Sequence, residues 1–319
     1  MEAPRATKGA PRADLEELLQ DLRRELLARD DSPTGAWVEE TARELAFGAK
    51  PGWLLPGGGG LAFYTRRGGE AYGHVHVVEG PAPGERAERL ATTVLEAFPP
   101  DVVSANLGFS GLSPDEERAC AARLGSRPGS TVIPRLLVER SLTESDGGDA
   151  PSLPAGLRAV PVRDVTLDAL ADLDHRCFEG TVDAFLVGAG LEGTRTAISA
   201  MLDGRLGRFV DEASLAVIDP DPPRLVAAVL TTEQSIRRAI LVDLMVDPAR
   251  RRHGLGRFLV AWAFRALWAL GYASVRLWVT EANLVARGLY DAVGFQTVGS
   301  ATIYRWDRPS AGPQPHVAR

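Results

Sequence analysis

The chain repeats one order of secondary-structure elements, and this repeat limits its fold more than any other feature. Two landmarks mark the first copy: Val78 at the end of a predicted strand, and Leu124 at the end of a predicted helix. Their counterparts, Val246 and Val293, lie 168 (246 less 78) and 169 (293 less 124) residues further along. Because two independent landmarks agree within one residue, we infer two copies of one α/β fold. The alternative is two unrelated α/β domains whose landmarks coincide.

Hydrophobic periodicity predicts the elements of each copy, and successive strands without an intervening helix indicate a mixed, mostly antiparallel sheet flanked by helices. In the first copy we expect helices over 13–28, 36–45, 85–98 and 114–124, and strands over 61–65, 73–78, 102–108 and 131–139. In the second copy we expect helices over 165–177, 194–206, 254–270 and 283–292, and strands over 214–218, 225–232, 239–246, 274–280 and 301–306.

One stretch without periodicity, rich in Gly, Pro, Ser and Asp, predicts the domain boundary. We place a linker at 143–156, between a first domain over 13–142 and a second over 157–308, with flexible ends at 1–12 and 309–319. A length of 319 residues suits two domains, and no apolar run approaches the ~20 residues that a membrane helix needs. The net charge of −6 argues against a general nucleic-acid binder, and the start of the chain lacks a secretory signal, so we expect a cytoplasmic protein.

A strand, a basic loop and a helix start follow one another over residues 244–256, and they predict an anion site. The first amides of a helix have no acceptor within the helix, and the helix dipole favours negative charge there. Gly254 and Gly256 have no Cβ, which lets phosphate oxygens approach the main chain. Arg251 and Arg252 add positive charge and directed donors. The segment is therefore typical of a pyrophosphate-binding loop.

Missing residues narrow the choice of phosphate ligand. The chain has no G-x-x-x-x-G-K-[ST] segment, and Leu259 occupies the place of the third glycine of a dinucleotide-binding fingerprint. What remains is R-x-x-G-x-G, at Arg251, Gly254 and Gly256. This pattern resembles the coenzyme A pyrophosphate loop of the GNAT (GCN5-related N-acetyltransferase) superfamily. Residues 281–295 strengthen the resemblance, because they match that family's N-x-x-A-x-x-L-Y-x-x-x-G-F segment at the expected distance.

The resemblance covers roughly residues 156–308 and, with the internal repeat, implies a fold of two tandem GNAT-type domains, of which the second uses acetyl-CoA. In the family, the strand that matches 244–246 carries a bulge and splays from the strand that matches 275–279, and the pantetheine arm lies in that gap. Amides of the following loop hold the pyrophosphate, and Asn283 would bond to the pantetheine region. The implied coenzyme-binding residues are Leu244, Met245, Val246, Arg251, Arg252, His253, Gly254, Leu255, Gly256, Arg257 and Asn283.

The implied reaction is acetyl transfer to a primary amine, of a small molecule or a protein, by direct attack in a ternary complex. Tyr290 matches the family tyrosine near the thioester sulfur and would act as general acid or orient the thioester. Asp243 and Glu281 are candidates for the base that takes the proton of the amine. The alternative for these two acids is a solvated or helix-capping role. The alternative for the whole protein is a non-catalytic acetyl-CoA sensor or protein-interaction module.

The first copy lacks the features of the anion site. Pro81 and Pro83 have no N–H to donate, and Glu85 repels phosphate, so we expect a degenerate copy without a coenzyme site. His74 and His76 lie on one face of a predicted strand at a spacing that metals can use, but no third ligand is apparent. We therefore expect no metal site.

Overall fold

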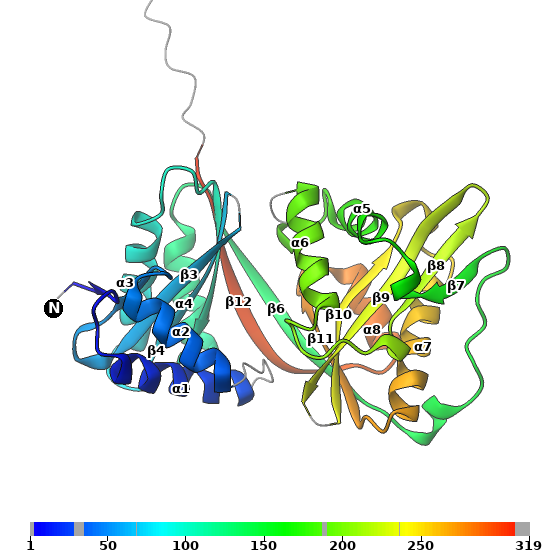
Figure 1. Ribbon diagram of the computed structural model, residues 1–319, viewed down its shortest axis with the longest axis horizontal. Helices are drawn as coiled ribbons and strands as arrows, with labels where there is room; N and C mark the ends of the chain where they lie inside the picture. The colour runs from blue at the N-terminus through cyan, green and yellow to red at the C-terminus, as the bar shows by residue number, and fades with distance from the viewer. Residues whose placement is uncertain (1–2, 29–34, 68, 187–189, 236, 310–319) are drawn as a thin grey trace, which may run out of the picture. The chain divides into compact units, whose positions relative to one another are not determined.

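The structure, a computed structural model, divides the chain into two compact units (Figure 1). It describes residues 3–28, 35–67, 69–186, 190–235 and 237–309. Among the described residues, those before 135 and those from 301 onward form unit 1, and those from 135 to 300 form unit 2. In the described part of the chain, no helix has the length and apolar character that crossing a membrane requires.

Unit 1 is a sheet with a pair of helices on each face (Figure 1). Its helices are α1 (Arg12–Ala28), α2 (Gly35–Phe47), α3 (Pro83–Glu96) and α4 (Pro114–Gly125). Its strands are β1 (Arg5–Ala6), β2 (Gly52–Leu54), β3 (Gly60–Arg67), β4 (Glu70–Val77) and β5 (Ser104–Ser110), with the start of β6 (Ser130–Ser141) and the end of β12 (Gln296–Asp307).

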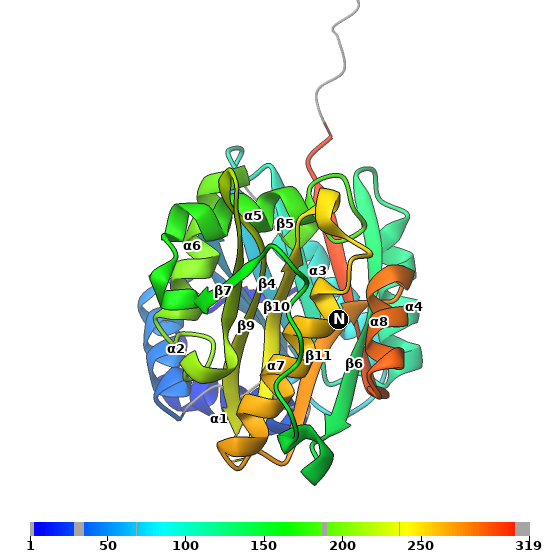
Figure 2. The same ribbon diagram turned by 90° about the vertical axis from the view of Figure 1, so that its right-hand side faces the viewer.

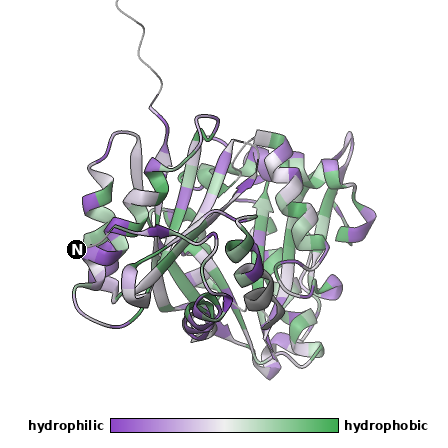
Figure 3. Cartoon of the chain, turned by 60° about the vertical axis from the view of Figure 1, so that its left-hand side comes forward, coloured by the Kyte–Doolittle hydropathy of each residue, from purple (hydrophilic) through white to green (hydrophobic). Residues whose placement is uncertain are grey.

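Successive side chains of β3 point to opposite faces of the sheet, so the sheet packs against both helix pairs of unit 1. Leu61 and Phe63 point into the core formed with α1 and α2, whereas Ala62 and Tyr64 point into the core formed with α3 and α4. Figure 3 shows the resulting hydrophobic character along the strands. The sheet is therefore buried on both faces, as its apolar composition predicts.

Unit 2 has the same layered plan (Figure 2). Its helices are α5 (Leu167–Phe178), α6 (Gly190–Leu202), α7 (Leu255–Ala269) and α8 (Leu284–Ala292). Its strands are β7 (Arg158–Pro161), β8 (Leu215–Pro220), β9 (Pro223–Ser235), β10 (Arg238–Val246), β11 (Ser274–Thr280), most of β6 and the start of β12. Short 3-10 helices include η2 (Glu144–Gly147), η4 (Ala184–Leu186) and η6 (Pro248–Arg250).

The two faces of the unit 2 sheet have separate cores. Side chains such as Leu259 and Phe264 of α7 pack on one face, in a core that α8 joins through Ala286 and Tyr290. Leu170 of α5, with its neighbours from α6, packs on the other face. These are called below the α7 face and the α5 face of the sheet.

Each unit takes one strand from the other half of the sequence. Strand β6, which follows α4, pairs antiparallel with β11 of unit 2 over 135–141. Strand β12, which follows α8, pairs antiparallel with β5 of unit 1 over 304–307. The units therefore differ from the domains 13–142 and 157–308 that we expected, because the last strands of the two halves exchange places.

Two further boundaries differ from expectation. In the N-terminal segment expected to be flexible, Arg5 and Ala6 pair with β2, and Thr7 is buried and donates a 3.2 Å hydrogen bond to the carbonyl of Leu45. The linker expected at 143–156 packs on α7, where Arg265 Nε donates to the carbonyl of Gly148 at 3.1 Å. Residues 310–319 of the expected flexible tail lie outside the described residues.

Candidate active site

Strands β10 and β11 separate after a short parallel pairing. The pairing covers only Arg238 to Ile240 against Ser274 to Arg276, although β10 continues to Val246 and β11 to Thr280. On its other side β10 stays paired with β9 up to Val246. The main chain of 244–246 on the β11 side therefore forms no ladder pair in the described structure, which is the splayed geometry expected at this place.

The loop after β10 presents a row of amides without acceptors. Within the described residues, the backbone N–H groups from Arg252 to Arg257 form no hydrogen bond, and the first donor of α7 is Phe258, which bonds to Gly254 at 2.9 Å. Arg252 and Gly254 have φ values of 68° and 83°, so the loop turns through two left-handed residues. Such turns aim successive amides toward one point, which favours an anion.

The two glycines of the loop have different roles. A Cβ built on Gly254 would meet nothing within 4 Å, so this position is open to a ligand. A Cβ on Gly256 would lie 3.0 Å from Leu289 Cδ2, so Gly256 allows α8 to pack closely against the first turn of α7. Only Gly254 therefore fits the expected role of letting a phosphate approach.

The guanidinium group of Arg251 bonds to main-chain carbonyls of the protein. Its Nε donates to the carbonyl of Val246 at 3.2 Å, and its Nη2 donates to the carbonyl of Cys177 at the end of α5 at 2.7 Å. Its guanidinium thus ties the end of β10 to α5. By contrast, Arg252 and Arg257 form no hydrogen bond or ion pair within the described residues, and both are exposed.

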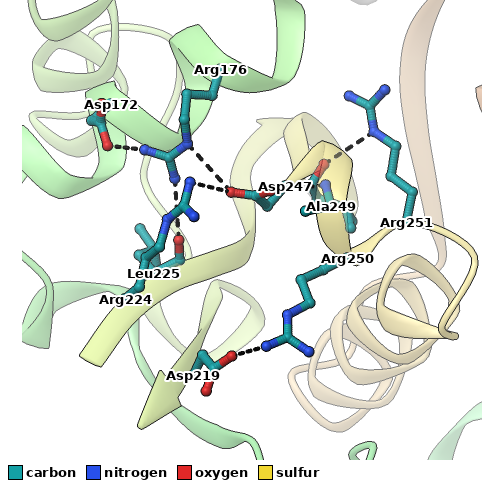
Figure 4. Close-up of polar contacts among 10 residues, drawn as sticks. Asp172, Arg176, Asp219, Arg224, Leu225, Asp247, Ala249, Arg250 and Arg251 are labelled. Atoms are coloured by element: carbon teal, nitrogen blue, oxygen red, sulfur yellow. Dashed lines mark hydrogen bonds and ion pairs between the residues drawn. The ribbon is translucent and has the colours of Figure 1, made fainter. Parts of the chain in front are cut away.

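A network of ion pairs fixes the base of the same loop (Figure 4). The buried Asp247 accepts from Ala249 N at 3.0 Å, and it pairs with Arg224 at 2.9 Å and Arg176 at 3.3 Å. Arg250 forms an ion pair with Asp219 of β8. Arg176, Arg224 and Arg250 therefore hold the loop in place, whereas Arg252 and Arg257 remain for a ligand.

A β-bulge decides which face Asp243 occupies. The register against β9 shifts between Leu241 and Asp243, so Val242 is the extra residue. Leu241 packs in the α7 face core and Met245 in the α5 face core, with Val242 also on the α5 face. Asp243 lies on the α5 face as well, since its neighbour Leu244 packs against the α7 face core and successive side chains alternate.

The two carboxyl groups shift each other's titration. Burial raises the pKa of Asp174 to about 7, although its hydrogen bond with Asp243 opposes the shift. Burial, followed by the charge and hydrogen bond of Asp174, raises the pKa of Asp243 well above its ordinary value. Both shifts favour the protonated form of a buried carboxyl group over its charged form.

Tyr290 lies on α8 with its ring edge against Phe295, at 5.6 Å between ring centroids. Its hydroxyl forms no hydrogen bond in the described structure. Burial, together with the negative charges of Asp243 and Asp183, raises the pKa of Tyr290, and Arg135 opposes the shift. The phenol is therefore held in its protonated form, near two carboxyl groups.

The other predicted site residues have structural contacts. Asn283 caps α8 by accepting from Ala286 N at 3.0 Å, and its Nδ2 donates to Asp183 at 2.6 Å. Its second N–H remains for a ligand. Glu281 is exposed, and its carbonyl accepts from Arg287 at 2.9 Å. The charge of Asp243 acts on the pKa of Tyr290, whereas within the described residues no contact joins Glu281 to either of them.

The comparison with protein families decides what this arrangement is. Residues 170–295 match the model of the acetyltransferase (GNAT) family. This part of the chain is a GNAT domain. It contains α5, the splayed strands, the amide loop and Tyr290, all within unit 2.

Relatives and solved structures agree with this. Mycothiol acetyltransferase of Frankia casuarinae is 44% identical over 67 residues, which cover 21% of this chain and 20% of that protein. The [ribosomal protein bS18]-alanine N-acetyltransferase of Salmonella typhimurium is 35% identical over 85 residues, which cover 27% and 55%. The chain thus matches about half or less of these relatives' length. A tandem GNAT protein from the clavulanic acid biosynthesis pathway has a TM-score of 0.59 at 17% identity, covering 98% of each chain, which supports a tandem GNAT fold.

Unit 1 differs from the GNAT domain at the corresponding strands. Strands β4 and β5 pair along seven positions, from Glu70 with Ser104 to His76 with Ser110, so they do not splay. Ser110 Oγ lies 2.8 Å from His74 Nε2 and 2.9 Å from His76 Nδ1. The two histidines therefore bridge β4 to β5, and no group of three metal-ligating side chains occurs in the described part of the chain.

The start of α3 in unit 1 differs from the amide loop in its residues. Arg86 donates to the carbonyl of Gly59 at 2.8 Å and to that of Val78 at 2.6 Å. Helix α3 also has Pro83 at its first turn and Glu85 as its first acidic residue. The place that corresponds to the amide loop therefore has fewer donors and an acid beside them.

Two residues of unit 2, Asp174 and Arg135, were not predicted as site residues from the sequence. Asp174 lies in an amphipathic helix, and only its buried position distinguishes it from a surface acid. From the sequence, the acids of 178–183 suit a cationic amine or a solvated loop equally, and the structure buries Asp183. Arg135 comes from the first half of the sequence through β6, and it donates to the carbonyl of Trp278 at 2.9 Å. Arg135 could not be predicted as a site residue, because only the exchange of β6 and β12 brings it into unit 2.

Proposed function

We propose that unit 2 transfers the acetyl group of acetyl-CoA to a primary amine. The observation that supports this proposal is that one unit has three groups without a hydrogen-bond partner in the described structure. They are the main chain of 244–246 on the side of β11, the amides of 252–257 and the hydroxyl of Tyr290. The first would accept an amide-containing arm, the second a pyrophosphate, and the third would lie near the reacting sulfur.

The chain's own groups suit the coenzyme in charge and geometry. Amides at the start of α7 favour phosphate, and the side chains of Arg252 and Arg257 remain to neutralise it. We expect Leu244, Met245 and Val246 to bond through their main chain. Asn283 can add one N–H donor without releasing Asp183 or Ala286.

The chemistry we propose is direct attack by the amine. Asp243 takes the proton of the amine, and Tyr290 gives its proton to the departing sulfur. The raised pKa of Tyr290 supports an acid role, because the phenol keeps its proton at neutral pH. The exposed Glu281 remains a candidate for relaying a proton to water.

Unit 1 is, in this proposal, a degenerate GNAT copy without a coenzyme site. Its closed β4 and β5 pairing leaves no gap for a pantetheine arm. Pro83 in the first turn of α3 has no N–H to donate, and Glu85 adds a negative charge there. The first half of the sequence also supplies unit 2 with the part of β6 that pairs with β11.

Thiol release from acetyl-CoA tests the proposal. We expect release to be stimulated by at least one amine from a panel that includes alaninamide and 1,4-diaminobutane, with the acetylated amine detected by mass spectrometry. A protein that binds acetyl-CoA but releases no thiol with any amine would contradict the enzyme and favour the sensor.

A further inference from the structure

The connection between α5 and η4, residues 178–183, is fixed internally by its own hydrogen bonds. The hydroxyl of Thr181 donates to the carbonyl of Phe178 at 2.7 Å, and the amide of Asp183 donates to that hydroxyl oxygen at 3.2 Å. The amide of Ala184, the first residue of η4, donates to the carbonyl of Thr181 at 3.1 Å. Because each turn bonds to the preceding one, the position of the whole connection depends on the contacts at its two ends.

Arg251 holds the end of the connection that joins α5. The last carbonyl groups of a helix have no donor within the helix, and the helix dipole makes that end negative. Cys177 provides one of these carbonyls, since α5 ends at Phe178, and Arg251 Nη2 donates to it at 2.7 Å. Arg251 Nε donates to the carbonyl of Val246, the last residue of β10, at 3.2 Å. The guanidinium group therefore joins the end of α5 to the strand that leads into the amide loop.

Asn283 holds the other end of the connection. Its Nδ2 donates to Asp183 Oδ2 at 2.6 Å, and its Oδ1 accepts from the amide of Ala286 at 3.0 Å as the N-cap of α8. Asp183 is 4% exposed, so the bond between Asn283 and Asp183 is shielded from water and strengthened by the low local dielectric. Arg251 and Asn283, which belong to the two sequence motifs of the GNAT resemblance, thus fix the two ends of one short connection.

The amide loop and α5 have other contacts that remain when Arg251 is lost. Asp247, which is 3% exposed, pairs with Arg224 at 2.9 Å and with Arg176 of α5 at 3.3 Å. Arg176 also donates to the carbonyl of Leu225 at 3.3 Å, which holds the last turns of α5 on the sheet. Loss of the Arg251 guanidinium group should therefore free the connection after α5 without moving the loop.

The connection lies beside the groups that we assign to the reaction. The pKa of Tyr290 is raised by burial and also by the charge of Asp183, which places this carboxyl group near the phenol. Phe185 of η4 is 7% exposed, and the guanidinium carbon of Arg135 lies 5.7 Å from the centroid of its ring. Arg135 lies on the α5 face, because its neighbour Leu136 packs against the α7 face core and successive side chains alternate. Since Arg135 pairs with the last residue of β11, the connection borders the sheet where β10 and β11 have separated.

We propose that Arg251 and Asn283 are positioning residues, which together hold the connection 178–183 beside Tyr290 and so determine where the acceptor amine binds. This rests on the proposed function and adds to it two residues that act on the acceptor side. Arg251, although it opens the R-x-x-G-x-G pattern, then binds no phosphate, because its guanidinium group is directed at two main-chain carbonyls. The loop amides and Arg252 remain for the phosphate.

Hydrogen exchange of the protein without a ligand tests the contact of Arg251. The amides of 179, 181, 184 and 186 are hydrogen-bonded to the end of α5, within the connection and within η4. We expect peptides that cover 179–186 to exchange about tenfold faster or more in Arg251→Gln, because a bond from a charged group is lost. Arg252→Gln removes the same charge from the same loop but no contact with α5, and it should leave this exchange within about twofold of the wild type.

Asn283→Ser tests the contact at the other end. Serine also caps helices well, but it is shorter than asparagine and lacks the amide N–H that Asp183 accepts. We expect exchange over 179–186 to rise about tenfold or more, with the exchange of α8 within about twofold of the wild type. In both variants, wild-type exchange within α7 shows that unit 2 folds. Unchanged exchange over 179–186 in either variant would overturn the role of the residue replaced.

Kinetics separate a positioning residue from a phosphate ligand. We expect Arg251→Gln to raise KM for the amine about tenfold or more, and Kd for acetyl-CoA by no more than about threefold, since the amide loop stays in place. Arg252→Gln should show the reverse, with a higher Kd for acetyl-CoA and an unchanged KM for the amine. The amine is alaninamide or 1,4-diaminobutane, whichever is acetylated faster, and calorimetry gives the Kd.

The outcomes separate this proposal from the proposed function. If Arg251→Gln loses affinity for acetyl-CoA as Arg252→Gln does, with an unchanged KM for the amine, Arg251 is a phosphate ligand and the proposal is overturned. A wild type that acetylates no amine would overturn the proposed function and with it the acceptor role of the connection. The exchange comparison would in that case still decide whether Arg251 and Asn283 hold the connection in place.

Discussion

Replacing Tyr290 by phenylalanine is expected to lower the turnover of acetyl transfer by about 100-fold or more, while the affinity for acetyl-CoA stays within about twofold. General acid catalysis by a positioned side chain contributes roughly 10²–10⁴-fold. The Tyr290 hydroxyl makes no hydrogen bond in the described structure, and the ring contact with Phe295 survives the change. Steady-state thiol release and a coenzyme titration measure the two quantities.

Tyr272→Phe is the matched control for this change. Tyr272 lies in the same unit, and its hydroxyl bonds with Glu233 and Arg208 at 2.8 Å each. Its loss should affect stability more than turnover. Equal turnover in the wild type and Tyr290→Phe would remove Tyr290 as the acid, and a parallel loss of coenzyme affinity would show that the hydroxyl binds instead of reacting.

Gly254→Asp is expected to weaken acetyl-CoA binding by about 100-fold, which corresponds to about 2.7 kcal/mol. The aspartate would cap α7 with its own carboxylate, and so occupy the amides that we assign to the pyrophosphate. It would also place a negative charge where phosphate must approach. Isothermal calorimetry of the variant with acetyl-CoA measures the loss.

Gly271→Asp provides a close control, because it lies just beyond the other end of α7. Both glycines have φ of 83°, and a Cβ on either would meet nothing within 4 Å, so the backbone strain of the two variants is alike. We expect Gly271→Asp to bind acetyl-CoA as the wild type does. Gly254→Asn, which has the shape without the charge, should lose less affinity than Gly254→Asp. Equal affinities in all three variants would place the coenzyme elsewhere.

The amide loop could be predicted from the sequence because its signals are local. Gly254 and the strand that ends at Val246 fix a turn and a helix start within a few residues. The separation of β10 from β11 followed from the family resemblance. Arg251 illustrates the limit, since its position favoured a phosphate contact but its guanidinium bonds to the carbonyls of Val246 and Cys177.

The exchange of β6 and β12 could not be predicted, because both strands satisfy the same local pattern. Each has 12 residues and each follows a helix at the same point of the repeat. Which of them pairs with β11 depends on contacts far apart in the sequence. Arg135 reaches the α5 face only through this exchange.

The pairing of Asp174 with Asp243 was hidden for a similar reason. The face on which a side chain lies can be predicted from its position along a strand only when the strand has no bulge. The bulge at Val242 adds one residue to β10. Without the bulge, Asp243 would lie on the α7 face, away from α5. From the sequence alone, Asp243 is an acid on a predicted strand and Asp174 an acid on a predicted helix, and no pattern indicates that they lie close together.

The stoichiometry of acetyl-CoA binding tests the central claim most directly. In a calorimetric titration of the full chain we expect one site, which the splayed strands and amide loop of unit 2 provide and the closed β4 and β5 pairing of unit 1 does not. Two sites would contradict the degenerate first copy, and no binding would contradict the acetyltransferase itself.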